Sequence, residues 1–434
     1  MERLTFQADG PPLSAYRGAI LVTNRTHFWH VLGPGLLFSG AAVGISHLVQ
    51  ATRAGALFGL ALVGIIILIN AAKYPSFRFG VDYGHAARKS LLAGYRELGL
   101  WAPILFCVII FPMIPIIIAA ISATTAGIIA VITGTTLGIP VIASLLLALA
   151  AALMIFGGFG WLDRINRVLL AFLIVSTIAT TILVLPRVEW GTLADFGWTE
   201  NSAALLFLVA LAGFMPNPMD VSVAQSLWTV ESETRMGERE PTTLGEARAA
   251  FTTGYVLTAI LALCFCIMGA GVMHSNAVTP ASDAVGFATQ VIGLYRETLG
   301  ETAAFLASIA ALSVMLTTVL AAFDASARVF TSAYSEIADR HEASETRRVF
   351  VGLIVFFSVT AMAALFFLLS DFRSFIDFTT SIVFLSAPIV ATLNHVVITR
   401  CELPDDARPG PVLRYLNILA IGLMLTLAVS YFLL

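Results

Sequence analysis

The sequence predicts an all-α integral membrane protein with about eleven transmembrane helices. Of its 434 residues, 58% are hydrophobic and 12% are charged, and the mean hydropathy is +0.91. This composition leaves too little polar surface to cover a soluble globule of that size. Residues 98–162 contain no Asp, Glu, Lys or Arg. Because one bilayer crossing takes about 20 apolar residues, this stretch is long enough to cross twice.

Eleven apolar segments have the length of a membrane-spanning helix. They cover residues 34–53, 55–77, 101–122, 138–160, 167–186, 203–228, 250–274, 302–323, 349–370, 375–398 and 412–433. The stretch before them, 1–32, is broken by charges and prolines. It therefore indicates a cytoplasmic N-terminal segment and not a signal peptide.

The basic residues predict the orientation, because Lys and Arg collect in cytoplasmic loops. With the N-terminus in the cytoplasm, 20 of the 24 basic residues, Lys73 among them, fall in cytoplasmic segments. Only Arg53, Arg187, Arg296 and Arg373 fall outside. We therefore predict a multi-pass protein of the cell (inner) membrane with its C-terminus outside.

Two of the segments are interrupted near their midpoints. The first contains GISH at 44–47 and the sixth contains MPNP at 215–218. Proline lacks an N–H donor, and irregular backbone at membrane depth is tolerated only inside protein or beside a water-filled cavity. Paired interruptions in the first and sixth helices are typical of inverted-repeat (5+5) transporters of the amino-acid/sodium-symporter type, in which they build the substrate site. A simple proline kink is the alternative.

This architecture divides the chain into three parts. Residues 1–32 are the cytoplasmic segment, 33–398 the transporter core, and 399–434 a loop with the eleventh helix. Within the core we expect a first repeat over 33–186 and a second over 203–398.

The second interruption also has the pattern of a helix start. Asn217 is a good N-cap, Pro218 suits the first helical position, and Asp220 falls third, where a carboxylate can bond back to the cap. An ionisable residue inside a membrane is also a functional candidate. Asp220 therefore has two open roles, capping the half-helix and binding a coupling cation.

At these residues the sequence resembles the NRAMP (natural resistance-associated macrophage protein) family of divalent-metal transporters. Residues 33–59 align without gaps to the family pattern GPG…DPGN…AG…FG, and GIP at 138–140, DR at 163–164 and MP at 215–216 extend the resemblance over nearly the whole chain. The resemblance implies a secondary-active transporter. It implies a substrate site formed by Gly44, Ser46, His47, Ala212, Met215, Asn217 and Asp220.

The departures from the family indicate a divergent member. Where the family has Asp-Pro-Gly-Asn, this chain lacks the metal-binding carboxylate, because Gly44 stands in its place, and His47 replaces the amide. Ala212 and Met215 match the family, but the histidine after Met-Pro is Asn217. The family's third helix carries acidic residues implicated in proton passage, whereas the third helix here lies in the uncharged stretch 98–162.

These departures favour a small anion, of bicarbonate size, as the substrate. A divalent cation needs anionic or several hard oxygen ligands. His47, Met215 and Asp220 would make only a soft, singly charged site, so we expect no metal. The positive ends of half-helices beginning near Ser46 and Pro218 attract anions. A divalent metal cation (Mn, Fe or Mg) is the alternative substrate, and a passive channel is a further alternative.

Other polar residues are candidates for coupling and access. Ser313, Thr317 and Thr318 are possible ligands of a coupling Na⁺, although such hydroxyls commonly bond their own helix backbone. Arg53 is a candidate for drawing anions inward or for facing water. Thr380 is a candidate for lining the cavity.

Other function classes lack their motifs. There is no basic tract for nucleic acid and no Gly-Lys-Ser/Thr phosphate loop, and His341-Glu342 has no second histidine. The four cysteines match no zinc or disulfide spacing. We expect no enzyme activity and no cofactor, with the lipid bilayer and a small inorganic ion as partners; the oligomeric state stays open.

Overall fold

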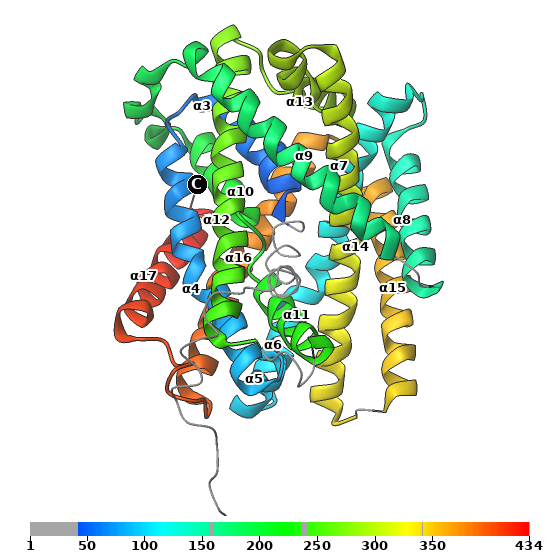
Figure 1. Ribbon diagram of the computed structural model, residues 1–434, viewed down its shortest axis with the longest axis vertical. Coiled ribbons are helices and arrows are strands. Elements are labelled where there is room, and N and C mark those ends of the chain that lie inside the picture. Colours follow the sequence, from blue (N-terminus) through cyan, green and yellow to red (C-terminus); the bar gives the residue numbers. More distant parts are fainter. Residues whose placement is uncertain (1–41, 157–159, 237–241, 341, 434) are drawn as a thin grey trace, which may run out of the picture.

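The computed structural model describes residues 42–156, 160–236, 242–340 and 342–433, and every regular element in these ranges is a helix (Figure 1). Eight of the described helices are long and apolar enough to cross a membrane. The chain is thus an all-α membrane protein, as predicted. The predicted cytoplasmic segment 1–32 and the start of the first spanning helix lie outside the described residues.

In the first half, the first spanning helix is seen from Ala42. Its elements are η2 (Ile45–Ala51), α3 (Thr52–Phe58), α4 (Val63–Ala87), α5 (Leu91–Leu98), α6 (Trp101–Ile110), η3 (Phe111–Met113), α7 (Ile114–Thr133), α8 (Ile139–Phe156) and α9 (Gly160–Val184). α6, η3 and α7 together form one span. Three short helices, η4 (Leu185–Arg187), η5 (Trp190–Ala194) and η6 (Gly197–Glu200), lead to the second half.

In the second half, the sixth spanning helix is divided into two pieces, as its prolines predict. The elements are α10 (Ser202–Phe214), α11 (Val221–Met236), α12 (Leu244–Met268), η7 (Gly269–Met273), η8 (His274–Asn276), α13 (Ala284–Leu299), α14 (Glu301–Ala338), α15 (Ala343–Phe367), α16 (Phe372–Arg400) and α17 (Pro411–Ser430). In Figure 1, α10 and α11 lie near the middle of the molecule, while α17 and α15 lie toward opposite edges.

The second spanning helix was predicted at 55–77, and the structure places the helix boundaries elsewhere. The first helix continues to Phe58, and α4 runs from Val63 to Ala87. Lys73, counted above with the cytoplasmic charges, lies inside α4 and is only 1% exposed. The prediction failed because a buried ammonium with protein partners is compatible with a spanning helix, whereas the sequence pattern treats it as a loop charge.

Two glycines bring the backbones of α3 and η7 into direct contact. A Cβ atom on Gly55 would lie 1.9 Å from the carbonyl oxygen of Cys266, and one on Gly269 would lie 2.2 Å from that of Thr52. Small residues at helix interfaces allow such close approach in membrane proteins. The interface joins the first spanning helix to the seventh.

Replacement of Gly55 by alanine is expected to lower the free energy of unfolding by about 1–3 kcal/mol, because the methyl group must push two backbones apart. The measurement is the Tm of the purified protein in detergent. Gly64→Ala on α4 is the matched control, since a Cβ there has no atom within 4 Å. Equal Tm values for the two variants would show that the contact is not tight.

Candidate functional site

A cavity of about 70 Å³ lies between the two interrupted helices, α7 and α14. Its wall includes backbone or side-chain atoms of Gly44 and Ser46 from the first helix, Asn217 and Asp220 from the sixth, and Thr318 from α14. The side contributed by α7 is apolar and consists of Ile114, Ile117 and Ile121. This is the region in which the sequence predicts the substrate site, and that role stays a prediction.

The first interruption leaves almost no room at residue 44. A Cβ atom on Gly44 would lie 3.1 Å from the methyl carbon of Thr318. The next polar residue, Ser46, donates its hydroxyl hydrogen to the carbonyl oxygen of Ala42 at 2.6 Å. Glycine therefore allows the first helix and α14 to approach closely beside the cavity.

His47 is not among the described residues that line the cavity. Its Nε2 lies 2.8 Å from the carbonyl oxygen of Thr258 on α12, and its Nδ1 lies 2.7 Å from Oγ of Ser46. Because a carbonyl oxygen can only accept, Nε2 carries a proton. The imidazole thus links the first helix to α12, which is the bond to a neighbouring helix typical of polar residues in membranes.

At the second interruption, backbone carbonyl oxygens accept hydrogen bonds from a lysine of another helix, α4. The ammonium of Lys73 lies 2.6 Å from the carbonyl oxygen of Ala212, 3.1 Å from that of Gly213 and 3.2 Å from that of Asn217. It also lies 6.0 Å from the centroid of the Phe384 ring on α16. Sequence reasoning missed this role; the available signal was a lone lysine inside the apolar run of α4.

Asp220 carries the acidic side chain of this region. It borders the cavity, and its charge interacts with the ammonium of Lys73. Ala212 and Met215 are fully buried and are not among the cavity's lining residues.

Two of the three predicted coupling-ion hydroxyls donate hydrogen bonds within their own helix. Thr317 donates to the carbonyl oxygen of Ser313, and Thr318 donates to that of Val314, both at 2.9 Å. Thr318 borders the cavity, and Ser313 and Thr317 do not. A hydroxyl that donates to its backbone keeps oxygen lone pairs for a cation, so the sodium site stays a prediction that centres on Thr318.

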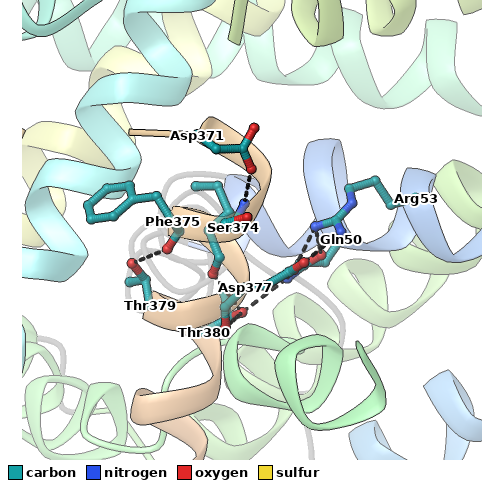
Figure 2. Close-up of polar contacts among 9 residues, drawn as sticks. Gln50, Arg53, Asp371, Ser374, Phe375, Asp377, Thr379 and Thr380 are labelled. Carbon is teal, nitrogen blue, oxygen red and sulfur yellow. Dashed lines mark hydrogen bonds and ion pairs between the residues drawn. The ribbon is translucent and has the colours of Figure 1, made fainter. Parts of the chain in front are cut away.

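A buried polar cluster of Gln50, Arg53, Asp377 and Thr380 joins the first helix to α16 (Figure 2). Arg53 donates two hydrogen bonds to the carboxylate of Asp377, at 2.7 and 2.8 Å, and one to Oε1 of Gln50, at 2.9 Å. Gln50 donates to Thr380 at 3.0 Å. We call these four residues the Arg53 cluster.

The Arg53 cluster corrects two interpretations of the sequence. Arg53 is 3% exposed and its guanidinium carbon lies 5.0 Å from the Phe207 ring centroid, so it neither faces water nor offers a free charge to anions. Thr380 contacts Gln50 and is not among the cavity's lining residues. The physical reason is that a buried guanidinium must be paired, and the pair closes this end of the first helix against α16.

Near the cluster, the start of α16 is fixed by Asp371, which precedes the helix (Figure 2). Its carboxylate accepts a hydrogen bond from the backbone N–H of Ser374 at 2.8 Å. Hydrogen bonding to the Ser374 side chain holds the pKa of Asp371 below its ordinary value. The carboxylate therefore remains an acceptor at the N-terminus of α16.

A second ion pair links α14 to α11. Arg328 contacts Asp324 of its own helix at 2.7 Å, the local pair that the spacing predicts, and approaches Glu231 of α11 to 3.7 Å. Trp228 of α11 and Ser326 of α14, close in sequence to these residues, line the cavity. The two helices that enclose the cavity are thus joined by charge as well as by packing.

Within the described residues, no group of three His, Cys, Asp or Glu side chains is placed to hold a metal ion. Among the described residues that line the cavity, Asp220 is the one acid. The described site therefore offers a divalent cation far fewer anionic ligands than such ions require.

No family model matches the sequence. The chain is 30% identical over 384 residues to an uncharacterized protein of Pasteurella multocida, PM0681, covering 86% of this chain and 87% of that protein. It resembles the structure of a manganese transporter from Eremococcus coleocola with a TM-score of 0.69 and 13% identity, over 94% of this chain and 86% of that one. It resembles MhsT, solved with L-phenylalanine, with a TM-score of 0.64 and 15% identity, over 95% and 98% of the two chains. These likenesses show that the chain has the fold of these transporters, as the resemblance to the NRAMP family implies.

Proposed function

Because the chain belongs to the same family as the Pasteurella multocida protein and has the fold of known transporters, we propose that it is a secondary-active transporter of a small inorganic ion. The cavity between the interrupted helices is its substrate site. The division into repeats over 33–186 and 203–398, and the orientation with the N-terminus in the cytoplasm of the inner membrane, are parts of this proposal.

The choice of substrate depends on the position of the Lys73 ammonium. The resemblance to NRAMP places Ala212 in the metal site, and here the carbonyl oxygen of Ala212 accepts a hydrogen bond from Lys73 at 2.6 Å. A divalent cation beside this ammonium would meet a like charge in a medium of low dielectric. In the part of the cavity wall that the structure describes, only Asp220 supplies a compensating carboxylate. A small monoanion of bicarbonate size is therefore the favoured substrate.

The size of the cavity and its place at the start of α11 support such an ion. A volume of about 70 Å³ is several times the ~10–15 Å³ that a cavity needs to hold one water molecule, so the site has room for a small polyatomic ion. α11 begins at Val221, beside Asp220, so the positive end of its helix dipole lies at the cavity wall. A co-bound Na⁺ near Asp220 and Thr318 would keep the filled site neutral, which favours sodium-coupled symport.

Flux into proteoliposomes tests the proposal. We expect saturable uptake of labelled bicarbonate that requires a Na⁺ gradient, persists without a pH gradient and shows counterflow. Uptake of Mn²⁺ is expected to equal that of empty liposomes. Saturable Mn²⁺ uptake would support the metal alternative and overturn the anion proposal, and non-saturable flux without counterflow would indicate a channel.

Substitution of Asp220 by asparagine is expected to raise the Na⁺ concentration for half-maximal uptake by about tenfold, which corresponds to ~1.4 kcal/mol. The reason is that the substitution removes the carboxylate that we place beside the sodium ion. Asp405→Asn, in an exposed loop, is the control and should leave the Na⁺ dependence unchanged. An unchanged dependence in Asp220→Asn would assign Asp220 to capping alone.

A further inference from the structure

We propose that the ammonium of Lys73 is a built-in cation, which occupies a carbonyl site that would otherwise bind a monovalent cation from solution. The site lies at the unwound centre of the sixth spanning helix. The proposal goes beyond the substrate proposed above, because it concerns a cation position whose occupant never leaves the protein.

The carbonyl site exists because the sixth helix is interrupted. The ordinary partner of the Ala212 carbonyl oxygen would be the N–H of residue 216, and Pro216 has none. α10 ends at Phe214, so the carbonyl of Gly213 also belongs to its last turn. The last carbonyls of a helix lack intrahelical donors and carry the negative end of the helix dipole.

The ammonium group of Lys73 has one N–H donor for each carbonyl oxygen that surrounds it. An ammonium group has three N–H donors, and Lys73 has three carbonyl oxygens within 2.6–3.2 Å, two from α10 and one from Asn217 beyond the break. The Phe384 ring and the charge of Asp220 add further attraction. A cage of backbone oxygens at the end of a half-helix is a kind of site that transporters use for monovalent cations.

The ammonium is covalently attached to the chain, and this attachment changes the role of the carbonyl site. Lys73 is 1% exposed and belongs to α4, so its charge balances the carbonyls without exchanging with either side of the membrane. No ion gradient can act at this position. Coupling to Na⁺, where it occurs, must use a different set of ligands, such as the region of Thr318.

The experiment measures the Tm of the purified protein in chloride salts of ammonium, methylammonium, sodium and N-methylglucamine at equal ionic strength. Wild-type protein is expected to have one Tm in all four salts. Lys73→Ala is expected to have a lower Tm in N-methylglucamine and to recover saturably as ammonium, methylammonium or sodium is added, because a ligand that binds only the folded state stabilises it.

Two further variants separate the site from general salt effects. Lys73→Met fills the same space without a donor, so its Tm should be low in every salt. Lys89→Ala removes a lysine whose side chain is 60% exposed, and should behave as wild type. Recovery of Lys73→Met equal to that of Lys73→Ala, or no recovery of Lys73→Ala by any small cation, would overturn the proposal.

Should Lys73→Ala aggregate in N-methylglucamine, its monodisperse fraction after size-exclusion chromatography in each salt replaces the Tm. Recovery in a small cation supports the proposal, and aggregation in every salt overturns it. None of these readouts involves flux. A failure of bicarbonate transport would therefore overturn the proposed substrate and leave the built-in cation standing.

Discussion

Replacement of Arg53 by methionine is expected to lower the free energy of unfolding by about 2–4 kcal/mol. Removing one partner of a buried ion pair costs ~3–5 kcal/mol, because the other charge is left uncompensated. The Asp377 side chain keeps 33% of its surface exposed, and solvent screening reduces the cost at such a group. The expected loss of unfolding free energy is still large, because Arg53 itself is buried and makes three hydrogen bonds within the Arg53 cluster.

Chemical unfolding in mixed micelles measures this loss, and a double-mutant cycle isolates the pair. Arg53→Met, Asp377→Leu and the double variant should give a coupling energy of about 1–3 kcal/mol, as for residues in one ion-pair network. Arg187→Met, at an exposed arginine, is the control and should cost little. Additive effects of Arg53→Met and Asp377→Leu would mean that the pair contributes nothing to closing the first helix against α16.

The class of protein and the interruption of the sixth helix could be predicted because their signals are local. Hydropathy is a property of about 20 consecutive residues, and a proline breaks the helix in which it stands. The positions of Pro216 and Pro218 thus predict that α10 and α11 are separate helices, and the structure confirms it. Helix ends were less predictable, since α14 continues to Ala338, well past its most apolar part.

The partners of the buried charges could not be predicted, because they are distant in sequence. Lys73 and Ala212 are 139 residues apart, and Arg53 and Asp377 are 324 apart. A sequence pattern shows that a lysine interrupts an apolar run, but it does not show which carbonyl groups the fold brings to it. The same limit applies to His47, whose partner Thr258 is 211 residues away. Of the residues predicted for the substrate site, Gly44, Ser46, Asn217 and Asp220 are among the described residues that line the cavity, and His47, Ala212 and Met215 are not.

The misjudged residues share one physical property. Lys73, Arg53 and His47 are all almost fully buried, and each makes a polar contact with a group from another helix. A membrane protein has few such groups, so those of the substrate site and those that join the helices look alike in sequence. Apart from Asp220, the described residues of the cavity wall are neutral, such as Gly44, Ser46 and Thr318.

Gly44→Asp restores the carboxylate of the NRAMP pattern, and we expect it to reduce bicarbonate uptake by more than about tenfold, a loss of ~1.4 kcal/mol or more in substrate stabilisation. The new carboxylate would add a second negative charge beside Asp220, and its Cβ would press on Thr318 at 3.1 Å. Gly44→Ala has the same Cβ without the charge, so it separates crowding from repulsion. Uptake in Gly44→Asp equal to that in Gly44→Ala would show that charge at this position does not select the substrate.

The single variant Gly44→Asp is not expected to transport Mn²⁺, because Lys73 still holds the carbonyl of Ala212 and places an ammonium beside the site. Binding of Mn²⁺, measured by isothermal titration calorimetry, is expected only when Gly44→Asp is combined with Lys73→Met. Saturable Mn²⁺ uptake by Gly44→Asp alone would mean that the missing carboxylate, and not the lysine, is what separates this chain from a metal transporter. The combined variant changes the charges at the site and keeps the fold. It therefore tests whether these charges select the substrate.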